Sequence, residues 1–172
     1  MPLSKPLLAS ISGYAVAGGL ELSLLADIRI GERSSKYGVY CRRLGVPLID
    51  GGTVRLPRLI GLSRALDIII SGRTVNADEA LQIGLINRLV DDGQSLNESI
   101  SLAKELLKFP YECMNNDRLS AYYSISHTLD ESLKYEYENG LKIVEKGLVQ
   151  GPKQFVGGKE RNTEKKIVLS ML

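Results

Sequence analysis

Short apolar runs separated by turns dominate the first third of the chain. Residues 7–12 (LLASIS) are apolar and lie between a proline and a glycine, which predicts a β-strand. A glycine-rich turn, residues 13–19, follows, and residues 20–26 are apolar on nearly every side, which predicts a buried helix. Residues 28–30 predict a second strand. The order strand, helix, strand favours an α/β fold with a parallel sheet.

Helical periodicity replaces the strand pattern after about residue 51. Residues 53–60 and 63–70 are apolar at helical spacing. Residues 76–83 begin with an Asn-x-x-Glu capping box, which predicts another helix, and residues 86–90 predict a strand. Three further helices are expected over about 97–108, 111–125 and 128–148.

The chain has no internal repeat and no clear linker, so a single domain over residues 1–172 is predicted. Within it we expect an α/β part at 1–95, a mainly helical region at 96–150 and a tail at 151–172.

Composition excludes several classes of function. The net charge of +2, without a basic block, argues against a nucleic-acid-binding protein. No apolar run approaches the roughly 20 residues that a membrane span needs, and the first residues lack the layout of a signal peptide. The two cysteines and one histidine suggest neither a disulfide framework nor a metal site. We therefore expect an intracellular protein, in the cytoplasm or in an organelle matrix, without a membrane or nucleic-acid partner.

The turn that contains Gly18, Gly19 and Glu21 is the first candidate for chemistry. Paired glycines let a ligand approach the backbone closely, and the first N–H groups of a helix have no partner within that helix. Such donors can stabilise negative charge on a substrate oxygen. A carboxylate among leucine and alanine is costly without a partner or a task. The alternative is a tight packing turn with Glu21 at the positive end of the helix dipole.

A second candidate cluster runs from about residue 37 to residue 53. Asp50 precedes two glycines at an expected helix start, so it can be either an N-cap or a catalytic acid. Cys41 stands beside two arginines, but no histidine is near it in the sequence. His127, the single histidine, is predicted to be a surface or capping residue.

Three segments together resemble the crotonase (enoyl-CoA hydratase/isomerase) superfamily. They are KPLLASISGYAVAGGLELSLLADIRIGERSSKYGV (5–39), DGGTVRLPRLIGLSRALDIIISGRTVNADEALQIGLINRLV (50–90) and GPKQFVGGKERN (151–162). The resemblance implies a crotonase-like α/β core of ββα turns, followed by a helical region used for oligomerisation. It implies homotrimers, often paired into hexamers, and acyl-coenzyme A thioester substrates with no further cofactor and no metal.

The resemblance also implies roles for individual residues. Gly18 matches the donor of one oxyanion-hole N–H, and Glu21 matches one of the two acid/base glutamates of the hydratases. The second glutamate falls at Cys41, whereas Asp50 matches the catalytic aspartate of the dienoyl-CoA isomerases. Gly19 and Cys41 are expected to contact the substrate.

The expected function is therefore that of an acyl-CoA enzyme that stabilises a thioester enolate for hydration or double-bond isomerisation. The resemblance covers the C-terminal two-thirds of the family's pattern, and it assigns the second oxyanion N–H to the preceding third. A non-catalytic pseudoenzyme, or a truncated subunit that assembles with complete family members, is the alternative.

Overall fold

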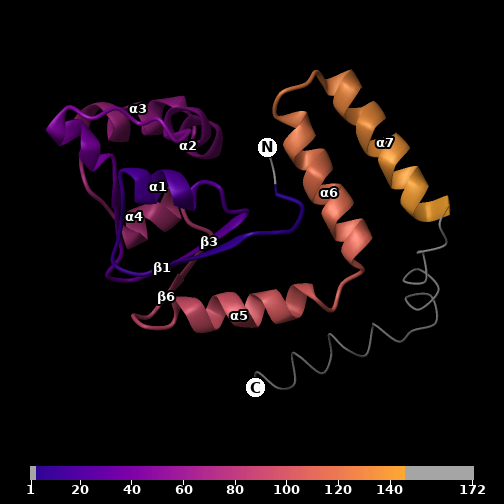
Figure 1. Ribbon diagram of the computed structural model, residues 1–172, viewed down its shortest axis with the longest axis horizontal. Coiled ribbons are helices and arrows are strands. Elements are labelled where there is room, and N and C mark those ends of the chain that lie inside the picture. Colours follow the sequence, from indigo (N-terminus) through magenta and orange to yellow (C-terminus); the bar gives the residue numbers. More distant parts are fainter. Residues whose placement is uncertain (1–2, 146–172) are drawn as a thin grey trace. The chain divides into compact units, whose positions relative to one another are not determined.

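The chain divides into two compact units, Met1–Lys108 and Phe109–Leu172 (Figure 1). The computed structural model describes residues 3–145, so the expected tail at 151–172 lies outside the described residues. No helix in the described part of the chain is long and apolar enough to cross a membrane.

A parallel three-stranded sheet forms the centre of the first unit. It consists of β1 (Leu8–Ile11), β3 (Ile28–Glu32) and β6 (Arg88–Val90), in the order β1-β3-β6. Both neighbouring pairs are parallel, and Ile30 in the central strand is fully buried. The three strands and their parallel direction confirm the prediction from the apolar runs.

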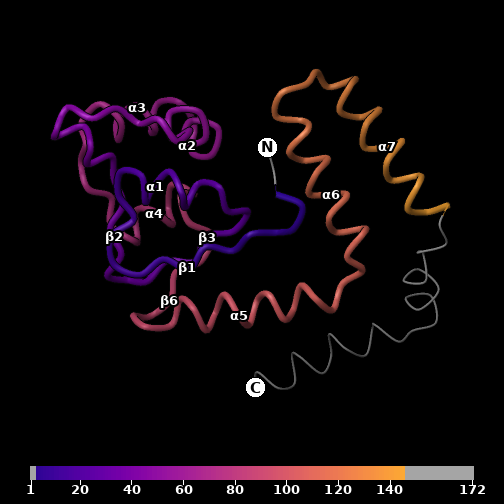
Figure 2. Tube along the Cα trace, viewed as in Figure 1, coloured from indigo at the N-terminus to yellow at the C-terminus, as the bar shows by residue number. Residues whose placement is uncertain are grey.

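A second, smaller sheet was not predicted. It contains β2 (Tyr14–Val16, labelled in Figure 2), β4 (Lys36–Gly38) and β5 (Val75–Asn76). The strand order is β2-β4-β5. The pair β2/β4 is parallel and the pair β4/β5 is antiparallel. Strands of two or three residues are too short to show an alternating pattern.

The helices of the first unit lie close to the predicted ranges. The predicted Asn-x-x-Glu cap is confirmed, because Asn76 Oδ1 accepts a hydrogen bond from the Glu79 N–H at 2.8 Å. The helix expected at 20–26 starts at Gly18, because the glycine pair itself is helical, and it already ends at Ser23. The helical elements are α1 (Gly18–Ser23), the 3₁₀ helix η1 (Tyr40–Leu44), α2 (Gly52–Ile60), α3 (Leu62–Ser71), α4 (Ala77–Gln82) and α5 (Ser95–Leu106).

One hydrophobic core joins these elements. Leu20 of α1, Leu56 of α2 and Ile68 of α3 are at most 1% exposed and belong to the same buried cluster. Helix α5 packs on β1 and β3, and therefore belongs to the first unit. The prediction of a single domain with a boundary near residue 95 stays a prediction.

The second unit contains α6 (Tyr111–Ser124) and α7 (Leu129–Glu145), which pack against each other as a hairpin (Figure 1). Tyr123 of α6 stacks on Tyr135 of α7 with a ring separation of 4.0 Å. No apolar residue of the described part of this unit is buried. The hairpin thus lacks the enclosed core that the α/β unit has.

Candidate active site

Free backbone donors mark the start of α1. Gly18 and Gly19 are exposed, and among the described residues the N–H groups of Gly18, Gly19 and Leu20 have no hydrogen-bond partner. The preceding residue, Ala17, has φ 51° and ψ −124°, which is a strained conformation for a residue with a Cβ. Its N–H donates to the Gly38 carbonyl at 3.0 Å, so strand β4 helps to hold the strained turn.

Glu21 of α1 is buried, and its carboxylate accepts hydrogen bonds from the start of α2. Its side chain is 2% exposed. One oxygen, Oε1, accepts hydrogen bonds from the N–H groups of Asp50 at 2.9 Å and Gly52 at 2.7 Å. No described residue donates a hydrogen bond to the other oxygen, Oε2. The carboxyl group is therefore fixed in orientation, with one oxygen available for a substrate or a water molecule.

The close approach of α2 to Glu21 requires a glycine at position 52. A Cβ added at Gly52 would lie 2.8 Å from Glu21 Cγ, 2.9 Å from Glu21 Oε1 and 3.0 Å from Leu48 Cδ1. These distances are shorter than those of ordinary van der Waals contacts. The second glycine of the Asp-Gly-Gly motif therefore allows the start of α2 to approach the carboxylate of Glu21.

Asp50 lies beside the same turn, with its side chain exposed. It is not the N-cap of α2, because Gly51 occupies that position with φ 95° and no side chain caps the helix. Asp50 Oδ2 is 3.9 Å from the place where a Cβ on Gly18 would stand. The structure thus brings Gly18, Glu21 and Asp50 together, and the N-cap interpretation of Asp50 is wrong.

Cys41 lies in η1, partly buried, and packs against the hydrophobic core. The neighbouring arginines bind main-chain carbonyls at the end of α3. Arg42 Nε donates to the Ile69 carbonyl at 3.3 Å, and Arg43 Nε donates to the Gly72 carbonyl at 2.9 Å. No hydrogen bond among the described residues links Cys41 to the two acids.

A family model described as enoyl-CoA hydratase/isomerase matches residues 1–162. The chain belongs to this family. The predicted membership of the enoyl-CoA hydratase/isomerase family is confirmed, whereas the roles of the glycine turn and the two carboxylates stay predictions.

Curated relatives agree with this assignment. A probable enoyl-CoA hydratase from Rhizobium meliloti is 34% identical over 132 residues, which is 77% of this chain and 51% of the relative. A short-chain-enoyl-CoA hydratase from Clostridium acetobutylicum is 31% identical over 79% of this chain and 52% of its own length. The chain thus spans about half the length of the curated relatives it matches.

Solved structures show the fold. An enoyl-CoA hydratase subunit from Geobacillus kaustophilus superposes with a TM-score of 0.83 at 28% identity, over 92% of this chain and 61% of that one. An enoyl-CoA hydratase from Bacillus anthracis gives a TM-score of 0.83 at 28% identity, over 93% and 61%. The predicted crotonase-like α/β fold is confirmed.

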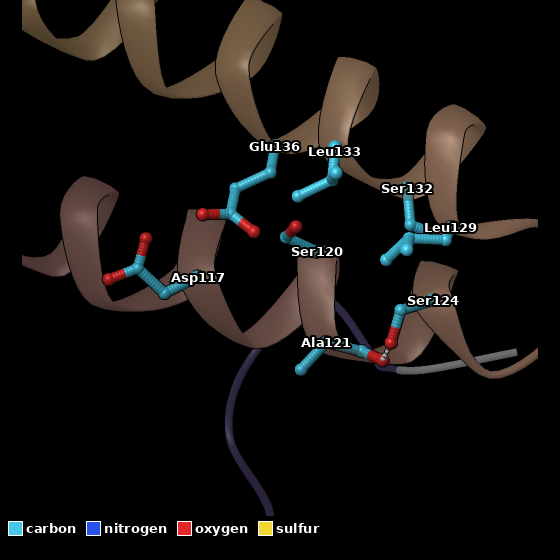
Figure 3. A pocket seen from close by; sticks show the side chains of 8 residues that line it. All are labelled: Asp117, Ser120, Ala121, Ser124, Leu129, Ser132, Leu133 and Glu136. Carbon is cyan, nitrogen blue, oxygen red and sulfur yellow. Dashed lines mark hydrogen bonds between the residues drawn. The ribbon is translucent and has the colours of Figure 1, made fainter.

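A cavity in the second unit lies between α6 and α7 (Figure 3). Its lining includes the carboxylates of Asp117 and Glu136 near one end and Leu129 near the other. It contains none of the predicted site residues. His127 is exposed in the same unit, stacked on Tyr123 at 3.5 Å, which agrees with the prediction of a surface residue.

Sequence reasoning missed a second buried carboxylate, Glu32 at the end of β3. It is 4% exposed and accepts a hydrogen bond from Ser95 Oγ at 2.7 Å. The Ser95 hydroxyl, then the Gly93 N–H and the Ser12 hydroxyl, lower the pKa of Glu32 from its usual 4.5 to about 2. Glu32 thus anchors the start of α5. Ser95 and Gly93 lie about 60 residues away in the sequence and Ser12 lies 20 residues away, so no local pattern could have revealed these partners.

Proposed function

We propose that this chain belongs to an acyl-CoA enzyme that stabilises the enolate of a coenzyme A thioester for hydration or double-bond isomerisation. One observation carries the proposal: a free N–H at Gly18, the buried carboxyl of Glu21 and the exposed carboxyl of Asp50 lie at one place in the fold. Donors and acids in this arrangement suit the polarisation of a carbonyl and the movement of protons beside it.

In the first step, the Gly18 N–H donates to the thioester oxygen, on which negative charge develops. The donor belongs to a strained turn held by β4, so it needs no reorganisation when the charge appears. Gly19, next to it, allows the thioester to approach the backbone. The resemblance implies that a second N–H donor comes from an earlier segment of the family.

In the second step, the two carboxyl groups move protons. For isomerisation, one carboxylate takes a proton from a carbon beside the conjugated system, and a carboxylic acid returns a proton to another carbon of the resulting enolate. For hydration, a carboxylate takes a proton from water as the water oxygen bonds to the β-carbon, and the α,β double bond opens to the enolate. A carboxylic acid then gives a proton to the α-carbon. Neither route needs a metal ion or a redox cofactor. Glu21 Oε2 and Asp50 are the groups available for these transfers.

The test is the turnover of crotonyl-CoA and of a dienoyl-CoA by the 172-residue chain and its variants. We expect Glu21→Gln and Asp50→Asn each to lower kcat at least about 100-fold, because each removes a proton-transfer group. Asp117→Asn, in the hairpin cavity, is the matched control and should retain activity. Turnover that survives Glu21→Gln together with Asp50→Asn would show that the site is assigned wrongly.

A second candidate function is a non-catalytic subunit that assembles with complete family members. The observation that favours it is the packing of Cys41 on the core, at the position where the resemblance places the second hydratase glutamate. A thiol cannot replace a carboxylate in the activation of water. Titration calorimetry with coenzyme A separates the two candidates, since binding at millimolar concentration or below by the isolated chain contradicts an inert role.

We further propose that the chain assembles as a homotrimer or a pair of trimers. An exposed apolar stripe along α7 supports this proposal. It consists of Leu129, Leu133, Tyr137, Leu141 and Val144, which are 40–73% exposed. Their spacing of three and four residues places them on one face of the helix. Light scattering would show a trimer or hexamer, and Leu133→Asp should lower the measured mass. An intracellular location stays a prediction.

A further inference from the structure

The turn that holds Glu21 is itself held by one side chain, Arg55 of α2. Arg55 Nη1 donates a hydrogen bond to the Asp50 carbonyl at 2.8 Å. The backbone N–H of Arg55 donates to the Gly51 carbonyl at 2.9 Å. The Gly51 carbonyl and the Gly52 N–H belong to the same planar peptide group. The hydrogen bond to the Gly51 carbonyl therefore also restricts the Gly52 N–H, which donates to Glu21.

The guanidinium of Arg55 also lies directly over Gly51. A Cβ added at Gly51 would collide with Arg55 Nη1, and Gly51 has φ 95°. Two consecutive glycines give this turn high backbone freedom. Arg55 therefore restricts a segment that its own sequence would leave flexible. The segment supplies both hydrogen bonds to Glu21.

The charge of Arg55 is not used for an ion pair within the described residues. Its side chain is half-buried, and its one side-chain hydrogen bond to a described residue goes to the main chain. Arg58, one turn further along α2, provides a natural comparison. Arg58 Nη1 also donates to a main-chain carbonyl, that of Val54 at 3.1 Å, but this bond stays within the helix.

We propose that Arg55 is a positioning residue for Glu21: it fixes the Asp50–Gly52 turn so that two N–H groups hold Glu21 Oε1 and leave Oε2 directed to the substrate. The inference rests on the proposed function of Glu21 as a proton-transfer group. Arg55 itself touches no reacting atom in this scheme. Its contribution is the orientation of the acid, and misplacement of a catalytic group by about 1 Å can cost on the order of 100-fold in rate.

Amide hydrogen exchange of the full chain tests the positioning without any need for activity. In Arg55→Met we expect the Asp50 and Gly52 amides to exchange about tenfold faster, because a hydrogen bond that holds the turn is lost. Arg58→Met should leave both rates unchanged within about twofold. Arg55→Lys keeps a donor and should restore most of the protection. If Arg55→Met unfolds the chain, Arg55→Gln should give a smaller increase, about threefold. Equal rates in the Arg55 and Arg58 variants would overturn the proposal.

Kinetics then test whether Arg55 acts through Glu21. Arg55→Met should lower kcat by about 10- to 100-fold with little change in KM, and Arg55→Lys should recover most of the rate. In a Glu21→Gln background the same substitution should have no further effect, because its target is already lost. An undiminished effect in that background would contradict action through Glu21.

The two proposals can fail separately. If Glu21→Gln leaves turnover intact, the proposed function fails, while the exchange rates still decide whether Arg55 holds the turn. If Glu21→Gln abolishes turnover and Arg55→Met matches Arg58→Met in exchange and kinetics, only the role of Arg55 is wrong.

Discussion

The α/β unit and the helical hairpin differ most in how they bury apolar side chains. Every buried apolar residue of the described chain lies between Ile11 and Leu102, whereas the hairpin exposes Leu129 by 73% and Tyr137 by 70%. The α/β unit encloses a core from its sheets and helices. The hairpin pairs two helices and leaves an apolar stripe uncovered within the described residues.

This difference suits the two proposed tasks, catalysis by the α/β unit and assembly through the hairpin. A catalytic site needs side chains held by many fixed neighbours, and Glu21, Gly52 and Arg55 have such neighbours in the α/β unit. A contiguous apolar surface of the kind on α7 suits contact with another chain. The four predictions below test this division, beginning with the largest expected effect.

Truncation of a core leucine should distinguish the units most clearly. Leu56 is fully buried, and Leu56→Ala should lower the free energy of unfolding by about 2–5 kcal/mol through lost contacts and a cavity. Leu129→Ala, in the hairpin, should cost the monomer less than about 0.5 kcal/mol. Urea denaturation measures both. Similar losses would mean that the hairpin has a core of its own.

Gly52→Ala should disturb the site and the stability together. The added methyl group overlaps Glu21 and Leu48, so we expect a loss of about 1–3 kcal/mol and a marked fall in kcat. Gly140→Ala in α7 is the matched control, since its Cβ would meet nothing within 4 Å. An unchanged kcat in Gly52→Ala would contradict the assigned role of Glu21.

Acid should weaken the α/β unit through Glu32. Because its pKa falls from 4.5 to about 2 on folding, Glu32 stabilises the fold above about pH 4.5, and this contribution is lost as the pH falls toward 2. Ser95→Ala removes the hydroxyl that lowers the pKa of Glu32 most. We therefore expect this variant to lose less stability than the wild type as the pH falls from about 4.5 to about 2. Ser99→Ala should behave as wild type, because among the described residues the Ser99 hydroxyl binds only the Ser95 carbonyl. Unfolding curves from pH 6 to pH 2 provide the measurement.

Tyr37→Phe should have the smallest effect. The Tyr37 hydroxyl is buried and makes no hydrogen bond of normal geometry among the described residues. Burial raises its pKa to about 12, although the Ser35 side chain beside it acts in the opposite direction. Its removal should leave stability unchanged or raise it by up to about 1 kcal/mol. Tyr40→Phe, which loses a 2.7 Å hydrogen bond to Thr74, should instead lower it slightly. A clear loss in Tyr37→Phe would reveal a partner for the hydroxyl.

Local patterns predicted the long elements well and the short ones poorly. The helices at Gly52–Ile60 and Tyr111–Ser124 begin and end within a residue or two of the expected ranges, because an apolar face and a glycine or proline boundary act over adjacent residues. The strand pair at Lys36–Gly38 and Val75–Asn76 was missed. Its partners are separated by almost forty residues, and each is too short for a period.

The candidate site was predicted only in part. Gly18, Glu21 and Asp50 were chosen from motifs, and the structure brings them together. The roles of Gly52 and Arg55 were not foreseen. The roles of Gly52 and Arg55 depend on how closely α1 and α2 pack in the folded chain. The sequence of the segment that connects the two helices does not reveal this distance.

By itself, the amino-acid sequence determined the family and the order of the main strands and helices, and it nominated the two acids as candidates, because these depend on local spacing and motif. Tertiary structure alone decided that Glu21 turns toward the start of α2, that Asp50 is not a cap and that Arg55 binds the turn between them. These relations arise when segments about thirty residues apart pack together, and packing is a property of the folded chain.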